Sequence, residues 1–160
     1  MIELVPPTEP LSQGDIFDEV TILRPQTDGT ILRYQSRIIV LTQSCDLAQS
    51  KAKRVVTSVI HDAADFVALG EVKSSAVRDQ IRRGLMFGLY FLPEAPNCNL
   101  PEMIVDLRDL HTIPRDVLES LAASGKRPAR LITPFREHLA QHFAVTYMRI
   151  ALPDPYPTNP

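Results

Sequence analysis

Residues 37–46 of the chain read Arg-Ile-Ile-Val-Leu-Thr-Gln-Ser-Cys-Asp, and they carry the clearest structural signal in the protein. The unbroken apolar run in residues 38–41 is typical of a strand that is buried on both faces of a sheet, because a half-buried strand alternates polar and apolar residues. The polar residues 42–46 follow this run directly, at a position where small sheets expose functional groups. We therefore predict a central strand that leads into a candidate functional loop.

A hairpin is predicted around this strand. Residues 14–23 are rich in Ile, Phe, Val and Thr with partial alternation, and Thr27-Asp28-Gly29 is a turn signal. The second arm of the hairpin runs from Thr30 to about Leu41 and contains the apolar run. Further strands are expected at residues 55–60, 85–92, 103–107 and 110–113.

Helical spacing replaces alternation in three segments. In residues 63–83 the apolar residues recur at helical intervals with charges between them, which indicates a helical insert at the surface. Pro114 opens a short helix that extends to about Ala123, and Thr133-Pro134 begins a closing helix. These elements predict an α+β fold, a small curled sheet or open barrel with a helical insert and a C-terminal helix.

Composition indicates an ordinary folded domain. Of the 160 residues, 44% are hydrophobic and 22% are charged, which argues against disorder and coiled coil. The net charge of -2 argues against a wholly basic nucleic-acid binder, so any contact with RNA or DNA must be local. We expect one domain over residues 11–151, with proline-rich extended tails at residues 1–10 and 152–160.

The sequence carries no signal for export or membrane insertion. The longest apolar run, residues 85–92, is less than half of what a bilayer crossing requires. The first ten residues lack the cationic and apolar regions of a secretory signal, and two cysteines make no disulfide framework. We therefore expect a cytoplasmic protein without membrane contact.

Three motifs are similar to those of one known family. Residues 13–17, Gln-Gly-Asp-Ile-Phe, look like its opening strand, and residues 37–44 are similar to its buried strand with a Ser/Thr-bearing loop. Residues 105–113 look like its strand that ends before a short helix. On these motifs the chain resembles the MazF/PemK-like toxin endoribonucleases. The resemblance implies an SH3-like barrel with a C-terminal helix, metal-independent RNA cleavage, no cofactor and a homodimer.

The chain also departs from the family pattern. Residues 25–31 lack the family's Gly-x-Glu-Gln pattern, and no proline follows Arg37. Asp106 precedes Arg108, whereas members related to the Kid toxin place the arginine first, and His111 stands where an arginine is usual. The residue types for catalysis are therefore present, but in another arrangement.

RNA cleavage through the 2′-hydroxyl needs a group that takes the hydroxyl proton, a group that protonates the leaving oxygen, and a cation for the phosphorane charge. Carboxylates, a histidine and arginines in the matched segments can fill these roles. The candidate catalytic residues are Arg37, Asp46, Asp106, Arg108 and His111. The candidate RNA-binding residues are Thr42, Ser44, Arg78, Arg82 and Arg83, the last three at helical spacing.

Each candidate group also has a purely structural interpretation. Asp46 would cap a short helical turn, with Ser44 satisfying backbone groups and Cys45 buried. The arginines of the insert would form a solvated helix face. Cysteines and histidines lack the paired spacing of zinc sites, and the segment 137–142 lacks the internal glutamate of a zinc-protease helix. We therefore predict no metal site.

Two functions from different classes follow. The first is an RNA-directed module that cleaves the phosphodiester bond without a metal. The second is a catalytically inactive barrel that binds another protein as a subunit of a bacterial defence or toxin-antitoxin-like system. Geometry separates them: a nuclease must bring Arg37, Asp46, Arg108 and His111 to one phosphate-sized cleft, whereas a binding subunit leaves them scattered or ion-paired.

Overall fold

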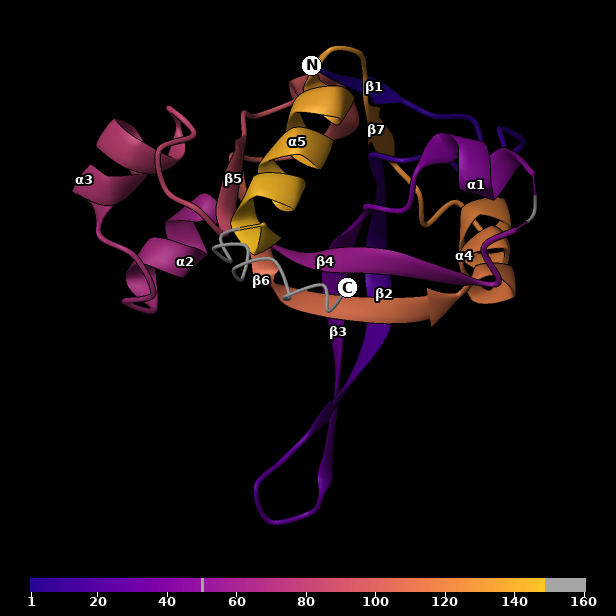
Figure 1. The fold of residues 1–160 in the computed structure, drawn as a ribbon, viewed down its shortest axis with the longest axis horizontal. Coiled ribbons are helices and arrows are strands. Elements are labelled where there is room, and N and C mark those ends of the chain that lie inside the picture. The colour runs from indigo at the N-terminus through magenta and orange to yellow at the C-terminus, as the bar shows by residue number, and fades with distance from the viewer. Residues whose placement is uncertain (50, 149–160) are drawn as a thin grey trace, which may run out of the picture.

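The computed structural model describes residues 1–49 and 51–148 and has an α+β fold built on one antiparallel sheet (Figure 1). The strands follow the order β1-β7-β2-β3-β4-β6-β5. The sheet is open, because β1 and β5 are its edges and no ladder within the described residues joins them. The strands are β1 (Ile2–Leu4), β2 (Asp15–Pro25), β3 (Ile31–Val40), β4 (Arg54–Asp62), β5 (Leu89–Leu92), β6 (Met103–Pro114) and β7 (Ala129–Leu131).

The central strand is buried on both faces, as its sequence predicts. Ile38, Ile39 and Val40 of β3 are fully buried. Ile39 packs with Ile16 in one core cluster, whereas Ile38 and Val40 pack with Phe17 in a second cluster on the other side. The sheet therefore separates two apolar layers, and this strand contributes to both.

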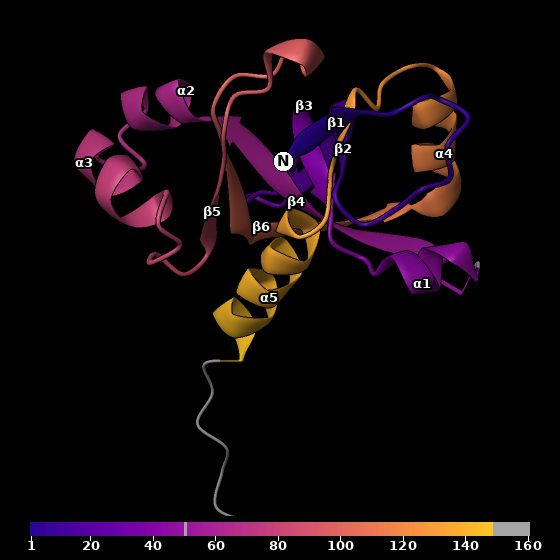
Figure 2. The ribbon, with the colours of Figure 1, turned by 90° about the horizontal axis from the view of Figure 1, so that it is seen from above.

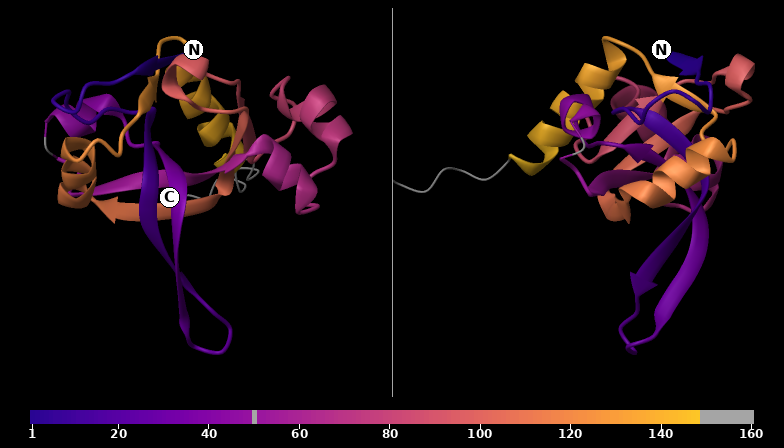
Figure 3. Two further views of the ribbon diagram at one scale, coloured as in Figure 1. Left: turned by 180° about the vertical axis from the view of Figure 1, so that it is seen from behind. Right: turned by 90° about the vertical axis from the view of Figure 1, so that its right-hand side faces the viewer.

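The predicted hairpin is formed by β2 and β3, and its outer part extends well beyond the body (Figures 1 and 3). Its turn is held by the Asp28 carboxylate, which accepts hydrogen bonds from the backbone N (2.9 Å) and Oγ1 (2.6 Å) of Thr30. Gly29 has φ +83°, a conformation that residues with a Cβ rarely adopt. We refer to the exposed outer part, residues 23–33, as the β2–β3 arm.

The two strands expected at 103–107 and 110–113 are one continuous strand, β6, with a large bulge. Ser58 of β4 pairs with Leu110, but the next residue, Val59, pairs with Asp106. Residues 107–109 are therefore looped out of the ladder. The Leu107 backbone N donates to the Gly88 carbonyl (2.8 Å), and its carbonyl accepts from Tyr147 Oη (2.5 Å).

The helices cover the sheet and close its ends. Leu118 of α4 (Arg115–Ala123) is buried in the core cluster that contains Ile38 and Val40, and Leu139 of α5 (Phe135–Tyr147) is buried in the cluster that contains Ile39. Both helices agree with the sequence prediction, and a short helix α1 (Ser44–Ala48) follows β3. In the described part of the chain, every helix is too short or too polar to cross a membrane.

The helical insert is confirmed. It consists of α2 (Ala63–Ala68), α3 (Ser74–Ala76) and a π-helical turn, η1 (Val77–Ile81), and it precedes β5. Its apolar residues form a third core cluster, which joins the sheet through Leu89 and Ile104. A 3-10 turn, η2 (Pro96–Cys98), lies between β5 and β6.

The amino-terminal segment is part of the fold, which corrects the expectation of an extended tail at residues 1–10. β1 pairs with β7, and the buried Arg127 guanidinium donates to the carbonyls of Pro6, Glu9 and Pro10 at 2.7–3.1 Å. The prolines of this segment do not exclude it from the sheet, because they follow β1 and leave all of its backbone N–H groups free to pair. The end of the predicted domain, residues 149–151, and the tail 152–160 lie outside the described residues.

Candidate functional site

Arg37 lies on β3 between two carboxylates. Its Nε is 2.5 Å from Asp18 Oδ1, and its Nη1 is 2.9 Å from Asp62 Oδ1. The same Nη1 contacts Met103 Sδ at 3.4 Å. Charge-assisted hydrogen bonds of this kind are roughly twice as strong as neutral ones. A phosphate would therefore have to displace two carboxylates to reach this guanidinium.

Asp106 and Arg108 form a closed pair at the β6 bulge. Arg108 donates to the Asp106 carboxylate from its backbone N (3.0 Å), Nε (2.8 Å) and Nη2 (2.7 Å). The hydrogen bonds that Arg108 donates to the Asp106 side chain are the main cause that raises the pKa of Arg108. The guanidinium is therefore already paired, and the two residues bind each other in place of a substrate.

His111 lies farther along β6 and is also paired. Its Nε2 is 3.0 Å from Asp109 Oδ1, and the other oxygen of Asp109 accepts a hydrogen bond from Arg24 of the arm. The Arg24 guanidinium lies over the Tyr34 ring, with 5.2 Å between its carbon and the ring centroid. Burial raises the pKa of Tyr34. This cluster fixes the base of the arm to the bulge.

The polar loop after β3 forms a separate group. Thr42 Oγ1 accepts a hydrogen bond from the Val56 backbone N (2.8 Å), and Ser44 Oγ contacts Ser12 Oγ (2.8 Å) and the Gln13 backbone N (3.2 Å). Thr42 therefore joins the loop to β4, and Ser44 joins it to the segment before β2. The interpretation that Ser44 satisfies backbone groups is confirmed.

Asp46 and Cys45 lie on the short helix α1 and are both exposed. Asp46 is in the first turn, but α1 begins after Gln43 and no side chain caps it. The expected Asp46 cap is therefore wrong, and so is the expected burial of Cys45. Among the described residues no side chain pairs with the Asp46 carboxylate, because the helix presents it to solvent.

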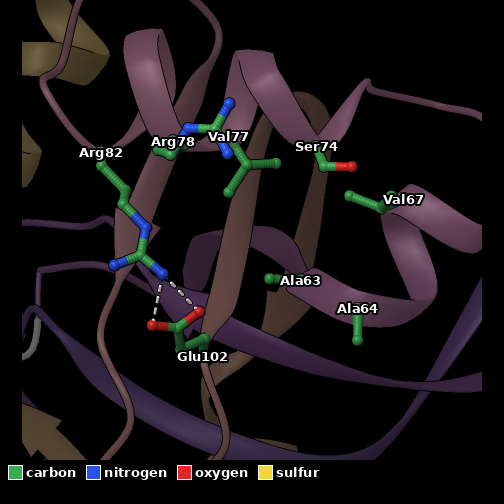
Figure 4. Close-up of a pocket in the computed structure, with 8 residues that line it drawn as sticks. All are labelled: Ala63, Ala64, Val67, Ser74, Val77, Arg78, Arg82 and Glu102. Carbon is green, nitrogen blue, oxygen red and sulfur yellow. Dashed lines mark hydrogen bonds and ion pairs between the residues drawn. The ribbon is translucent and has the colours of Figure 1, made fainter.

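Two of the three candidate arginines of the insert, Arg78 and Arg82, line a groove (Figure 4). Arg82 makes a bidentate ion pair with Glu102 (2.5 and 2.6 Å) and covers the Phe91 ring at 4.5 Å. Arg78 contacts only its neighbour Asp79, at 3.3 Å, and both side chains are more than half exposed. Arg83 is exposed and does not line the groove. We call this space, of about 620 Å³, the insert groove; it is lined by Ala63, Ala64, Val67, Ser74, Val77, Arg78, Arg82 and Glu102.

The candidate residues do not converge. Figures 1 and 2 show α1, which follows the polar loop, at the opposite end of the molecule from the insert. Arg37 is paired with carboxylates of β2 and β4, whereas Arg108 and His111 are paired with carboxylates of their own strand, β6. Sequence reasoning identified these residue types but missed Asp18, Asp62 and Asp109, since their pairing depends on strand register and a bulge.

The described residues contain no group of three His, Cys, Asp or Glu side chains that could hold a metal ion. Burial raises the pKa of the Cys98 thiol, which keeps it protonated and unsuited to metal binding. His61 stacks on Phe66 at 4.7 Å, and His142 packs against Tyr90 at 5.6 Å. These two histidines, His61 and His142, therefore pack against aromatic rings.

The sequence predicts the hairpin of β2 and β3, but not that its outer part, the β2–β3 arm, projects from the body. Leu23, Ile31 and Leu32 are 57%, 65% and 48% exposed. β7 pairs with β2 only at Asp15 and Ile16, and β4 pairs with β3 only in residues 37–40. Within the described chain, the outer strands therefore pair only with each other. The available signal was that both predicted hairpin strands, residues 14–23 and 30–41, are longer than the next predicted strand, residues 55–60.

In comparisons with known proteins, no protein-family model matches the chain, and no curated protein matches it in sequence.

Proposed function

We propose that this protein is a protein-binding subunit and that the β2–β3 arm is its contact surface. The partner is a protein that adds an extended segment to one edge of the arm, so that main-chain hydrogen bonds supply affinity and apolar side chains supply specificity. The observation that carries this proposal is the combination of unpaired strand edges and exposed apolar side chains on one projecting hairpin.

The cross-strand register places the apolar residues where a partner can reach them. Leu23 pairs with Arg33, and Pro25 pairs with Ile31, so Leu23 and Ile31 share one face of the ribbon. Ile22 and Val20 point to the opposite face and are buried in the core. A two-stranded ribbon is only marginally stable in water without further packing, and unprotected edges of this kind promote pairing with another chain.

The ion pairs support a binding role over RNA cleavage. Each arginine or histidine that a nuclease would use is neutralised by a carboxylate of the same chain. Arg82 of the insert is likewise paired with Glu102, which argues against one continuous cationic path for RNA. RNA cleavage is the alternative that the experiments below must exclude.

We also propose that the open sheet is a relative of the SH3-like barrel of the MazF/PemK-like proteins. The order of a long hairpin, a buried central strand, a strand before a short helix, and a closing helix supports this relationship. A bacterial defence or toxin-antitoxin-like complex is the setting that this relationship suggests for the partner.

The contact surface is tested by site-specific photo-cross-linking in cells that produce the protein naturally. A photoreactive residue replaces Leu23, and the matched control replaces Val117, an exposed apolar residue of α4. We expect the Leu23 position to cross-link one partner through an extended segment, and the cross-link to be lost when Ile31 and Leu32 are changed to Ser. Equal cross-linking from both positions would show that the arm is not the contact surface.

The catalytic alternative is tested with total RNA, with and without a chelator. We expect intact RNA at high protein concentration. Cleavage that persists with the chelator and disappears in Arg108→Ala would establish the nuclease and reject the binding role as the main function.

A further inference from the structure

We infer that the insert groove is a binding site for a small amphipathic carboxylate, an aliphatic chain with one anionic head. This site is separate from the β2–β3 arm and does not depend on the function proposed for it. It is assembled from α2, the α3–η1 segment and Glu102, the residue before β6 (Figure 4).

The walls of the groove are apolar and made of small side chains. Ala63 and Ala64 begin α2, and Val67 and Val77 face the same space from the two helical segments. Because two alanines occupy positions where larger residues would fill the space, a volume of about 620 Å³ stays open. This volume lies in the range of small-molecule sites, which are mostly apolar with a few polar groups that fix orientation.

The charges at the rim leave one cation uncompensated. Arg82 is neutralised by two hydrogen bonds from its Nη2 to the Glu102 carboxylate and is held over the Phe91 ring. Arg78 has only a long contact with Asp79, the next residue, and such exposed pairs contribute little. The residues that line the groove therefore include two cations, Arg78 and Arg82, and one carboxylate, Glu102, beside an apolar interior. This excess of positive charge in the lining favours an anion with an aliphatic tail over a cation or a neutral lipid.

The π-helical geometry of η1 is a second, independent observation. The backbone N of Arg82 donates to the Val77 carbonyl (3.1 Å), a bond across five residues. Within this wide turn Val77 belongs to the core of the insert, and the next residue, Arg78, lines the groove. Single π turns are uncommon and occur frequently at functional sites.

The experiment uses the full chain and sodium octanoate below its micelle concentration, with octanol and octylammonium as neutral and cationic probes. Binding is followed by calorimetry and by backbone amide shifts. We expect octanoate to bind with a dissociation constant of about 0.1–1 mM and to shift amides of α2 and η1. Octanol and octylammonium should bind at least about tenfold more weakly.

Three variants make the test specific. Arg78→Gln should weaken octanoate binding roughly five- to tenfold, and Ser74→Asp, an exposed change that adds a negative charge to the groove, should abolish it. Arg83→Gln is the matched control, since it removes a nearby exposed cation outside the groove, and it should bind as the unmodified protein does.

The inference is overturned by any of four results. These are no octanoate binding at millimolar concentration, equal binding of octanoate and octanol, an Arg83→Gln effect as large as that of Arg78→Gln, or amide shifts confined to the arm. Loss of partner cross-linking at Leu23 would have no bearing on this site, so the two proposals fail separately.

Discussion

Arg37 illustrates how single charged residues are used in this sheet. Its guanidinium joins Asp18 of β2 to Asp62 at the end of β4, and thus connects strands on both sides of β3. Arg108 and His111 are paired in the same way with carboxylates of the β6 bulge. The three candidate catalytic residues Arg37, Arg108 and His111 therefore help to position strands.

The strongest case is the buried pair between Arg127 and Asp15, whose side chains are both fully buried. Arg127→Met should lower the free energy of unfolding by about 3–5 kcal/mol, because it leaves the Asp15 charge buried with fewer partners. Arg136→Met, which breaks an exposed pair with Glu137, should cost less than about 1 kcal/mol. Denaturant unfolding measures both, and equal effects would contradict the prediction.

The turn of the arm should respond to acid. The hydrogen bond from the Thr30 side chain, more than any other cause, holds the pKa of Asp28 below its ordinary value of 3.8. Since the folded pKa is lowered, this support is present above pH 3.8 and is lost as the pH falls through the lower folded value. The protection of the Thr30 amide, its exchange rate relative to that of an unstructured amide at the same pH, should decrease over that acid range, and in Asp28→Ala this amide should be unprotected at every pH. An unchanged rate in Asp28→Ala would show that the carboxylate does not order the turn.

At the scale of elements, the β6 bulge joins three parts of the chain. It receives the Gly88 carbonyl from the segment before β5, the hydroxyl of Tyr147 from α5, and Arg24 from the arm. The sequence predicts two strands with a break between them, whereas the structure has one strand, β6, and its bulge makes these three contacts. Bulges commonly re-aim side chains in this way.

Gly88 is the residue on which this junction depends. It has φ +84°, and an added Cβ would lie 3.0 Å from Arg108 Cγ. Gly88→Ala should lower the free energy of unfolding by roughly 2–3 kcal/mol, through backbone strain and displacement of Arg108. Gly84→Ala is the control, since φ is +66° but no atom lies within 4 Å of the added carbon, and it should cost about 1 kcal/mol. Equal losses in thermal or denaturant unfolding would show that contact with Arg108 has no effect.

At the scale of the whole molecule, the candidate surfaces point in different directions. The arm extends away from the body, while the insert lies at one end and α1 at the other (Figures 1 and 3). The net charge is -2, and most arginines are paired within the chain. The molecule therefore has separated sites on a rigid sheet and no single central cleft.

This charge distribution predicts weak and shallow RNA association. At about 150 mM salt, single-stranded RNA should bind with a dissociation constant no tighter than about 10 µM, and affinity should change little with salt because few counterions are released. Fluorescence anisotropy across a salt series measures both quantities. A steep salt dependence would indicate a continuous phosphate-binding surface and contradict the proposed binding role.

The local pattern of the chain was sufficient to locate the hairpin, the doubly buried strand, the helical insert and both later helices. Each depends on periodicity or on turn residues, such as the unbroken run in residues 38–41 and Thr27-Asp28-Gly29, which act over short distances. β1 and β7 were not predicted, because strands of three residues carry too few positions for a pattern.

The partners of the charged residues were decided only by the tertiary structure. Asp18, Asp62 and Arg37 are distant in sequence, and they meet because β2 and β4 are the neighbours of β3 and Asp18 lies at the shift of register between Phe17 and Val20. The extra residues 107–109 then turn Arg108 back onto Asp106. The sequence determined which elements form, since local propensity is written in neighbouring residues, whereas register and bulges determined which side chains remain available for function.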